Sequence, residues 1–314
     1  MAAIVHADRI HAALKANGAA RSALVASWQR SSALHHLDPA ERKPPRRLTD
    51  AELALARQRV EPLLRAARAS LDRLYLAVGG VGCCVLLADR DGVPVERRGA
   101  PGDDRTFRDW GLWTGAVWSE DVEGTNGIGT CLVEQRALTI HRDQHFFSRN
   151  TLLSCTTAPI YDHEGRLAAA LDVSSCRADL TEGFVHLISV AVGDAARRIE
   201  AEAFRLAFPN ARLVLVPTPD NSPAALVAVD HDDLVIGATR AARLALDVSF
   251  AHPFPVADIF GQTAPEGIAD AERSALRRAL ARADGNVSAA ARSLGLSRAT
   301  LHRKLARLGL QRGH

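Results

Sequence analysis

The chain has 314 residues, of which 47% are hydrophobic and 24% are charged. That length suits two or three domains, and the composition excludes a wholly disordered, collagen-like or disulfide-scaffold protein. The formal net charge of +3 conceals an asymmetry, because residues 266–314 hold ten Lys or Arg against four Asp or Glu. A basic tail on a mildly acidic body indicates a polyanionic partner for the tail.

No stretch of the sequence favours a membrane segment. The longest uncharged stretch, residues 74–88, is shorter than the ~20 residues that a spanning helix needs, and glycines interrupt it. Charged residues scattered through the amino terminus leave no apolar core for a signal peptide. We therefore expect a soluble, cytoplasmic protein with no membrane partner.

The amino-terminal part is expected to be helical. Apolar residues at helical spacing run into a Pro- and Arg-rich cluster at residues 43–47, which predicts a linker. A long helix is predicted to begin at Thr49, whose hydroxyl can accept a hydrogen bond from the amide of Glu52 while the Glu52 carboxylate reaches back. Its apolar stripe continues to Val78, and Pro62 is a point at which this helix can kink.

Short β-like runs follow and predict a sheet. The runs cover residues 83–88, 137–141, 158–161 and 167–173. Turns at residues 89–92 and 162–165 separate hairpin strands, and helical spacing returns from Phe184 to Ile199. The simplest assembly is a mixed sheet flanked by two long helices, which belongs to the α+β class.

A smaller αβ unit and a helical end complete the chain. Strands are expected at residues 213–216, 225–229 and 234–237, a short helix at 239–246, and only helices beyond Pro265. The sequence thus predicts four parts. They are an N-terminal helical segment with a linker (1–48), a sheet domain (49–203), a small αβ segment (204–264) and a helical end (265–314).

The helical end has the pattern of a helix-turn-helix. The predicted helices cover residues 268–283, 287–294 and 298–308. Asn286 and Ser297 are expected to cap the second and third helices, and Gly295 to supply the left-handed residue between them. Because basic residues gather on the third helix and no acid follows Asp284, DNA is favoured over a solvated helical hairpin.

The stretch from Gly285 to Leu305 resembles the DNA-binding end of the nucleoid factor Fis and of bacterial enhancer-binding activators. The resemblance implies that double-stranded DNA is the partner, that the protein is a homodimer, and that the third helix enters the major groove. The residues expected at the DNA are Ser297, Arg298, Thr300, His302, Arg303, Lys304 and Arg307.

A second motif lies between residues 115 and 130, where three glycines surround the polar pair Thr125 and Asn126. Glycines at such spacing let the backbone approach another group closely. Followed by His145, Phe146 and residues 154–160, the motif resembles the sensory GAF domain of the acetoin and glycerol metabolism regulators, which are sigma-54 activators. The resemblance implies a GAF fold and a sensory role.

Two further stretches resemble the same family. Residues 27–31 and 37–39 match its amino terminus, and residues 225–260 match its short PAS-like segment, although Thr239 stands where that pattern usually has Asn. The family usually carries an ATPase domain before the helix-turn-helix, whereas here fewer than ten residues separate Phe260 from the first predicted helix of the helical end. No Gly-Lys dipeptide occurs, so a P-loop is absent. We expect a transcription regulator without ATPase activity, with RNA polymerase as a candidate partner.

The expected sensory site is an enclosed cavity for a small, mostly uncharged organic molecule, with a partner protein as the alternative. The expected apolar lining is Trp113, Trp118, Phe146, Leu152 and Ile160. The residues expected to bind the ligand are Trp113, Trp118, Glu120, Thr125, Asn126, His145 and Cys155. No basic cluster lies beside the glycines, which argues against a nucleotide. For Glu120, Asn126 and His145, an equal alternative is hydrogen bonding that only holds the loop.

No metal, cofactor or enzymatic activity is expected. His141 and His145 have the spacing of zinc ligands on a helix, but Arg142 stands where a zinc protease has Glu. The five cysteines form no Cys-x-x-Cys pair, which favours buried thiols. One rival is a thiol enzyme resembling free methionine sulfoxide reductases, which needs a partly exposed, reactive Cys155 or Cys131. The other is an interaction scaffold with a vestigial, closed pocket.

Overall fold

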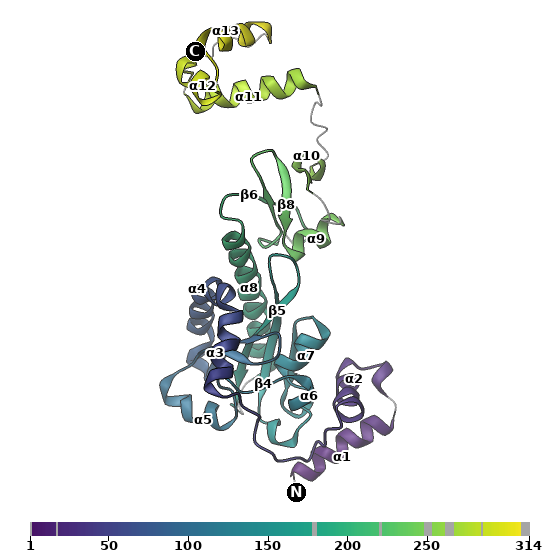
Figure 1. Cartoon of the computed structure of the whole chain (residues 1–314). Helices are drawn as coiled ribbons and strands as arrows, with labels where there is room; N and C mark the ends of the chain where they lie inside the picture. Colours follow the sequence, from purple (N-terminus) through teal and green to yellow (C-terminus); the bar gives the residue numbers. More distant parts are fainter. Residues whose placement is uncertain are drawn as a thin grey trace. The chain divides into compact units, whose positions relative to one another are not determined.

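The computed structural model describes residues 2–16, 18–177, 181–219, 222–247, 253–260, 267–283 and 285–308. The chain divides into two compact units, Met1–Phe254 and Pro255–His314, and Figure 1 shows the order of the elements in each. The expected boundary at residue 265 and three charged residues of the tail, Glu266, Asp284 and Arg312, lie outside the described residues.

A five-stranded sheet in the order β2-β1-β5-β4-β3 forms the centre of the first unit. Its strands are β1 (Cys83–Asp89), β2 (Pro94–Arg98), β3 (Leu138–His141), β4 (Ser154–Tyr161) and β5 (Leu167–Ser175). The α+β class is confirmed, but the expected mixture of strand directions is wrong, because the described pairings are all antiparallel. The predicted turns at residues 89–92 and 162–165 do form, and hairpin turns of this length join antiparallel strands.

Helices cover both faces of this sheet. On one face, α4 (Glu61–Val78) packs beside α8 (Glu182–Ala207), the long helix in the middle of Figure 1. Their apolar stripes meet the sheet at Leu71, Val85 and Ile199. The opposite face carries α5 (Asp104–Asp109) and α7 (Gly127–Glu134), with the short α6 (Glu120–Glu123) before α7. Strands β1 and β5 are therefore covered on both sides, which explains their continuous apolar runs.

The helix predicted from Thr49 is in fact two helices. Thr49 caps α3 (Asp50–Arg59) with the expected capping box, since its Oγ1 accepts from the Glu52 amide and the Glu52 carboxylate accepts from the Thr49 amide. The chain leaves helical geometry at Val60, where φ is −108° and ψ is 14°. Pro62 lies in the first turn of α4. It begins a new helix rather than kinking one, because Pro lacks the N–H that a preceding turn requires and suits a helix start.

The N-terminal segment, residues 2–48, consists of α1 (Ala2–Lys15), α2 (Ala23–Gln29) and the π-helical turn Arg30–Leu34, followed by a stretch without helix that leads to α3. This stretch includes the predicted linker, where Arg47 forms a bridge with Ala116.

A second sheet follows α8, in the order β6-β7-β8-β9. The elements of this part are β6 (Arg212–Leu215), β7 (Leu226–Val229), β8 (Leu234–Ala238), α9 (Arg240–Leu246) and β9 (Phe254–Pro255), and α10 (Val256–Ile259) follows in the second unit. Thr239 caps α9 by accepting from the Ala242 amide, and its hydroxyl donates to the Ala224 carbonyl at 2.6 Å. Thr therefore serves as the helix cap at the position where the resembled family has Asn.

The C-terminal unit contains α11 (Ile268–Arg282), α12 (Val287–Ser293) and α13 (Arg298–Arg307), which match the three predicted helices to within one residue. Among the described residues, no helix combines the length and the apolar character needed to cross a membrane.

Candidate functional sites

The C-terminal helices pack around a small apolar core. Its buried residues are Leu276, Ala279, Ala290, Ala291, Leu301 and Leu305. Asn286 caps α12 and Ser297 caps α13, each through its side-chain oxygen, as predicted. Gly295 has φ +64°, which supplies the left-handed turn between the two helices. Helices α12 and α13 therefore form a helix-turn-helix held against α11.

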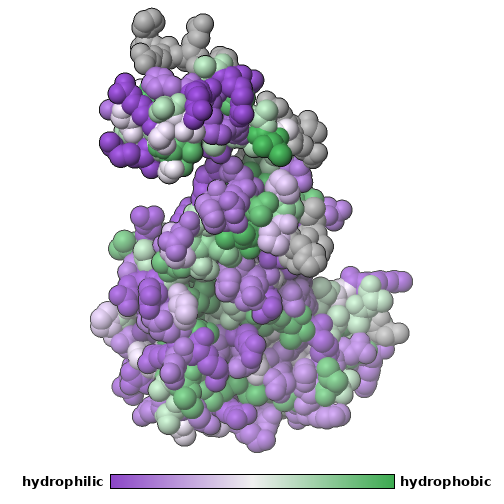
Figure 2. Space-filling model, turned by 45° about the horizontal axis from the view of Figure 1, so that its top comes forward, coloured by the Kyte–Doolittle hydropathy of each residue, from purple (hydrophilic) through white to green (hydrophobic). Residues whose placement is uncertain are grey.

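The expected DNA-binding residues lie along α13, and they do not all have the same surroundings. Arg298 and Arg303 are exposed, and the visible face of the C-terminal helices is mainly hydrophilic (Figure 2). Thr300 and His302 are half-buried. Ser297 and Thr300 share a hydrogen bond of 2.8 Å between their hydroxyls at the start of α13. Arg298 and Arg303 are thus accessible to a phosphate, as is the exposed Arg307.

Lys304 and Arg307 have a partner within the protein. Both form ion pairs with Glu272 of α11, and the Lys304 ammonium, with help from Arg307, lowers the pKa of that carboxyl. In this structure the two residues therefore tie α13 to α11. Their expected contact with DNA stays a prediction.

The N-terminal motif and the glycine-containing motif meet in a buried polar network. Ser27 Oγ lies 2.5 Å from Glu120 Oε1 and 2.7 Å from Thr125 Oγ1. Arg30 donates to both oxygens of Glu120, with Nη2 to Oε1 at 3.1 Å, and also to Glu134 at 3.1 Å. The Glu120 side chain is 1% exposed, so its charge depends on Arg30 and Ser27 for compensation.

Apolar and backbone contacts reinforce this docking of the N-terminal segment. Trp28 and Ile10 pack against Phe146 and Phe147 in one cluster. The indole N–H of Trp28 donates to the carbonyl of Gln144 at 2.8 Å. Sequence reasoning noted residues 27–31 as a family match but gave Ser27 and Arg30 no role, because nothing local shows which distant residue a polar side chain will meet.

The two tryptophans predicted at the ligand are held by the protein itself. Trp113 lies between the guanidinium groups of Arg97 and Arg108, at 4.2 and 4.3 Å from its ring centroid. Trp118 is buried, and its indole N–H donates to the carbonyl of Gly111 at 2.8 Å.

Asn126 and His145 also have internal partners. Asn126 caps α7 by accepting from the Gly129 amide, and its side chain donates to the Gly124 carbonyl. The Nδ1 of His145 bonds the Arg142 carbonyl at 2.9 Å, and burial lowers the pKa of this histidine to about 4. For both residues these are the loop-holding hydrogen bonds weighed as the alternative to ligand contact.

The expected apolar lining does not surround one cavity. Ile160 belongs to the core under α4 and α8, Trp118 to the core under α5 and α7, and Phe146 to the cluster with Trp28. Leu152 is 57% exposed. The prediction of one apolar lining is therefore wrong. The alternation of side chains along the strands and the course of the loops place these side chains on different faces of the sheet.

The glycines do allow a close approach of the backbone, but the atoms that come close are other parts of this protein. A Cβ on Gly129 would lie 2.5 Å from the Glu120 amide nitrogen and 2.6 Å from the Trp118 carbonyl. A Cβ on Gly127 would lie 2.6 Å from the Cβ of Cys155. Gly124 has φ +61°. The motif thus packs the start of α7 onto the sheet and onto its own preceding loop.

A buried carboxyl that the sequence analysis did not single out lies beneath α7. Asp172 accepts hydrogen bonds of 2.5 Å from the hydroxyls of both Thr157 and Ser174, and burial raises its pKa to about 6. Cys155 Sγ lies 3.1 Å from Ser174 Oγ, and burial followed by the charge of Asp172 raises the pKa of this thiol. In the sequence, the signal for this buried carboxyl is that Asp172 is the one acidic residue within the apolar run of β5.

The raised pKa of Asp172 predicts a pH dependence of stability. In the folded state the carboxyl binds its proton more tightly than in the unfolded chain, so stability is lost as the pH rises from about 4 through about 6. Asp172→Asn removes this loss, and the free energy of unfolding of the variant minus that of the wild type should grow by about 2 kcal/mol from pH 4 to pH 7. Urea titrations at several pH values measure it, with exposed Asp121→Asn as the control. A difference independent of pH would contradict the prediction.

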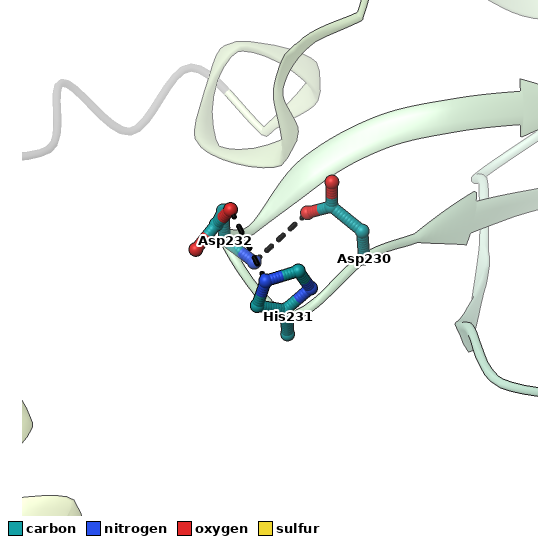
Figure 3. A group of neighbouring side chains, drawn as sticks. All are labelled: Asp230, His231 and Asp232. Carbon is teal, nitrogen blue, oxygen red and sulfur yellow. Dashed lines mark hydrogen bonds and ion pairs between the residues drawn. The ribbon is translucent and has the colours of Figure 1, made fainter.

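Three neighbouring polar residues, Asp230, His231 and Asp232, lie together at the hairpin between β7 and β8 (Figure 3). Asp230 Oδ1 accepts from the amides of Asp232 and Leu234 at 2.9 Å. Asp89 and Asp162 do the same for the turns after β1 and β4. The cluster is therefore a third turn of this kind, and its exposed groups do not define a metal site.

An open groove of about 720 Å³ lies between the linker, α3 and the loop before α7, and Glu120 is the one predicted ligand residue in its lining. Leu55 of α3 and Val133 of α7 line it and are 58% and 52% exposed. The turn after β1 and residues 117–122 contribute further walls. Its shape and partly apolar lining suit a polypeptide better than an enclosed small molecule.

The chain thus combines a helix-backed antiparallel sheet that has a glycine-containing loop with a helix-turn-helix. Residues 50–199 match the GAF domain family, and residues 267–308 match the family described as bacterial regulatory protein, Fis family. The chain therefore contains a GAF domain and a Fis-family DNA-binding domain.

Three curated relatives are transcription regulators by name. The chain is 34% identical over 240 residues to the acetoin catabolism regulatory protein of Cupriavidus necator, covering 75% of this chain and 36% of the relative. It is 30% identical over 178 residues to the acetoin dehydrogenase operon transcriptional activator AcoR of Bacillus subtilis (57% and 29% covered), and 29% identical over 177 residues to the propane 2-monooxygenase operon transcriptional activator MimR of Mycolicibacterium smegmatis (56% and 29%). The chain spans about a third of the length of these relatives.

The fold is also similar to that in the crystal structure of the E. coli DhaR(N)–DhaL complex. The TM-score is 0.54 at 16% identity, and the match covers 75% of this chain and 81% of that one. At this identity the match supports the fold alone.

Proposed function

We propose that this chain is a sequence-specific DNA-binding transcription regulator whose GAF domain senses a small molecule or a partner protein. The observation that carries the proposal is α13, a capped helix on a compact three-helix core that presents Arg298 and Arg303 to solvent. A basic helix presented in this way fits the major groove and neutralises phosphates. Such a role places its action in the cytoplasm, where the DNA is, with RNA polymerase as a further proposed partner.

DNA binding should depend steeply on salt, because the tail gains affinity by releasing counterions. Arg303→Ala should weaken binding by about tenfold on every DNA to which the wild type binds, and should make the salt dependence shallower. Fluorescence anisotropy at two salt concentrations measures both effects. Arg65→Ala, which removes an exposed arginine of α4, is the control. If the affinity for DNA is the same at low and moderate salt, the tail does not bind DNA as proposed.

A partner protein at the GAF domain is supported by two observations. The groove beside α3 and α7 is open and partly apolar. The DhaR(N) structure, which shares this fold, is a complex with the protein DhaL. A small molecule remains the second kind of signal, and it would need a site other than the one built from Trp113 and Trp118.

We further propose a homodimer formed through α4 and α8. These helices expose Leu76 (82%), Leu187 (64%) and Val190 (53%), which is more apolar surface than a solvent-facing helix needs. Leu187→Glu should raise the dimer dissociation constant by about a hundredfold, since burying one leucine contributes about 2 to 3 kcal/mol. Sedimentation velocity of the full chain measures it, with exposed Leu152→Glu as the control. A variant that dimerises like the wild type would place the contact elsewhere.

The thiol-enzyme alternative requires a reactive cysteine at the surface. Cys155 is 3% exposed and Cys131 is fully buried, and burial raises the pKa of both thiols. Because the thiolate is the nucleophile, these positions are poorly suited to methionine sulfoxide reduction. The absence of an ATPase domain between the GAF and Fis-family domains argues against ATP-driven promoter opening by this chain.

A further inference from the structure

The helical end carries few acids, and one of them is bound to two of the residues expected at the DNA. The described part of residues 267–308 holds nine Lys or Arg but only two Asp or Glu. Glu272 of α11 forms ion pairs with Lys304 and Arg307 of α13. The hydrogen bond from Lys304, together with the charge of Arg307, lowers the pKa of Glu272, so this carboxylate is charged at neutral pH. Two positive charges of α13 thus face an internal anion.

These ion pairs are not the main contact that holds α13 on α11. The buried side chains Leu276, Leu301 and Leu305 already join the two helices in one apolar core. The ion pairs are partly open to solvent, since the side chain of Glu272 is 19% exposed and that of Arg307 is 64% exposed. Pairs of this kind contribute little to stability, because water and salt screen them. The presence of an acid at this position is therefore not explained by folding alone.

Arg307 is within reach of two kinds of anion. It follows Arg303 by four residues, so the two side chains are neighbours on one face of α13. A DNA phosphate that contacts the exposed Arg303 would therefore lie close to Arg307 as well. Carboxylate and phosphate both accept two parallel hydrogen bonds from a guanidinium group. Glu272 and a DNA phosphate can thus replace each other as the partner of Arg307, and the half-buried Lys304 beside it can exchange in the same way.

We propose that Glu272 competes with DNA phosphates for Lys304 and Arg307 and so lowers the affinity of the helical end for DNA. While both ion pairs are intact, α13 neutralises phosphates mainly through Arg298 and Arg303. Phosphate contacts supply the binding that is independent of sequence, whereas base contacts come from the start of the recognition helix. The competition therefore weakens binding to DNA of any sequence. This inference rests on the proposed function, because it requires that α13 binds DNA.

Glu272→Gln in the full chain tests the proposal, because it removes the charge and keeps the size of the side chain. Fluorescence anisotropy with a duplex of random sequence, at several salt concentrations, compares the variant with the wild type. The variant should bind about tenfold more tightly at low salt, and the slope of log affinity against log salt should steepen by about one to two per bound protomer, since two more cations can neutralise phosphates. Glu61→Gln, which makes the same charge change at a surface pair of α4, should alter neither quantity.

A double-variant cycle separates competition from a change in folding. Arg307→Ala should weaken DNA binding by less than about twofold in the wild type, where Glu272 already holds the arginine, and by about tenfold in the Glu272→Gln background. Circular dichroism checks that each variant keeps its helices. If Glu272→Gln does not fold, Arg307→Ala alone still decides, because a loss of affinity as large as that of Arg303→Ala would contradict the proposal.

Two results would overturn the proposal. One is a folded Glu272→Gln variant that binds DNA no more tightly than the wild type, which would make Glu272 a support for the two cations and not a competitor. The other is an effect of Arg307→Ala that is equally large with and without the Glu272 charge. The proposed function fails by a different result, a wild type whose affinity for DNA does not depend on salt, so the two failures are distinguishable.

Discussion

Gly129→Ala should lower the free energy of unfolding of the GAF domain by about 3 kcal/mol, a large effect for one methyl group. The new Cβ would lie 2.5 Å from the Glu120 nitrogen and 2.6 Å from the Trp118 oxygen. Both are backbone atoms, so no side chain can rotate away to relieve the contact. The gain of about 1 kcal/mol in helix propensity from Gly to Ala is too small to compensate fully.

Chemical denaturation followed by fluorescence measures this change, and Gly183→Ala is the matched control. Gly183 lies in α8, and no neighbouring side chain or loop comes within 4 Å of the position that a Cβ would occupy. The same substitution should therefore leave stability unchanged or raise it by up to about 1 kcal/mol. If Gly129→Ala and the wild type are equally stable, the loop before α7 can move to accept the methyl group, and the prediction is wrong.

Arg30→Ala should destabilise the docked N-terminal segment by about 3 kcal/mol, because it leaves the buried charge of Glu120 without its cation. The remaining contact of Glu120 Oε1 with Ser27 is a single hydrogen bond. The expected result is lower thermal stability together with faster hydrogen exchange in α2. Loss of an exposed pair contributes much less, so Arg65→Ala, which breaks the surface pair with Glu61, should cost under about 1 kcal/mol.

A second substitution separates charge from packing. Glu120→Gln in the Arg30→Ala background removes the unpaired charge, so the double variant should regain part of the lost stability. A double variant less stable than Arg30→Ala alone would mean that the carboxylate has another cation or donor that compensates it.

The predictions for Arg30→Ala and for the double variant concern regulation as well as stability. The polar network joins Ser27 and Arg30 to the loop that precedes α7. If the chain senses a signal as proposed, a signal that loosens or tightens this junction would act on the GAF domain without entering its core. The core under α5 and α7 is filled by its own side chains, including Trp118 and Phe107.

Local patterns predicted the helix-turn-helix closely. Caps at Asn286 and Ser297, the turn glycine Gly295 and the apolar spacing of Leu301 and Leu305 all act between residues within one or two helical turns. The same holds for the capping box at Thr49 and for the hairpin turns. Interactions of this range join residues that are close together in the chain, so a single sequence is enough to predict them.

Residues far apart in the chain decided the rest. Whether Glu120 faces a ligand or Arg30, 90 residues away, depends on how the N-terminal segment folds back, and no local pattern encodes that return. Lys304 and Arg307 are basic residues of the kind that contacts phosphates, but in the folded chain both are paired with Glu272 of α11. The sequence by itself determined the two domain types and the helix-turn-helix, whereas the tertiary structure alone decided which polar groups are already paired. The physical reason is that a buried charge or hydroxyl takes whichever partner packing brings within about 3 Å, and packing is a property of the whole fold.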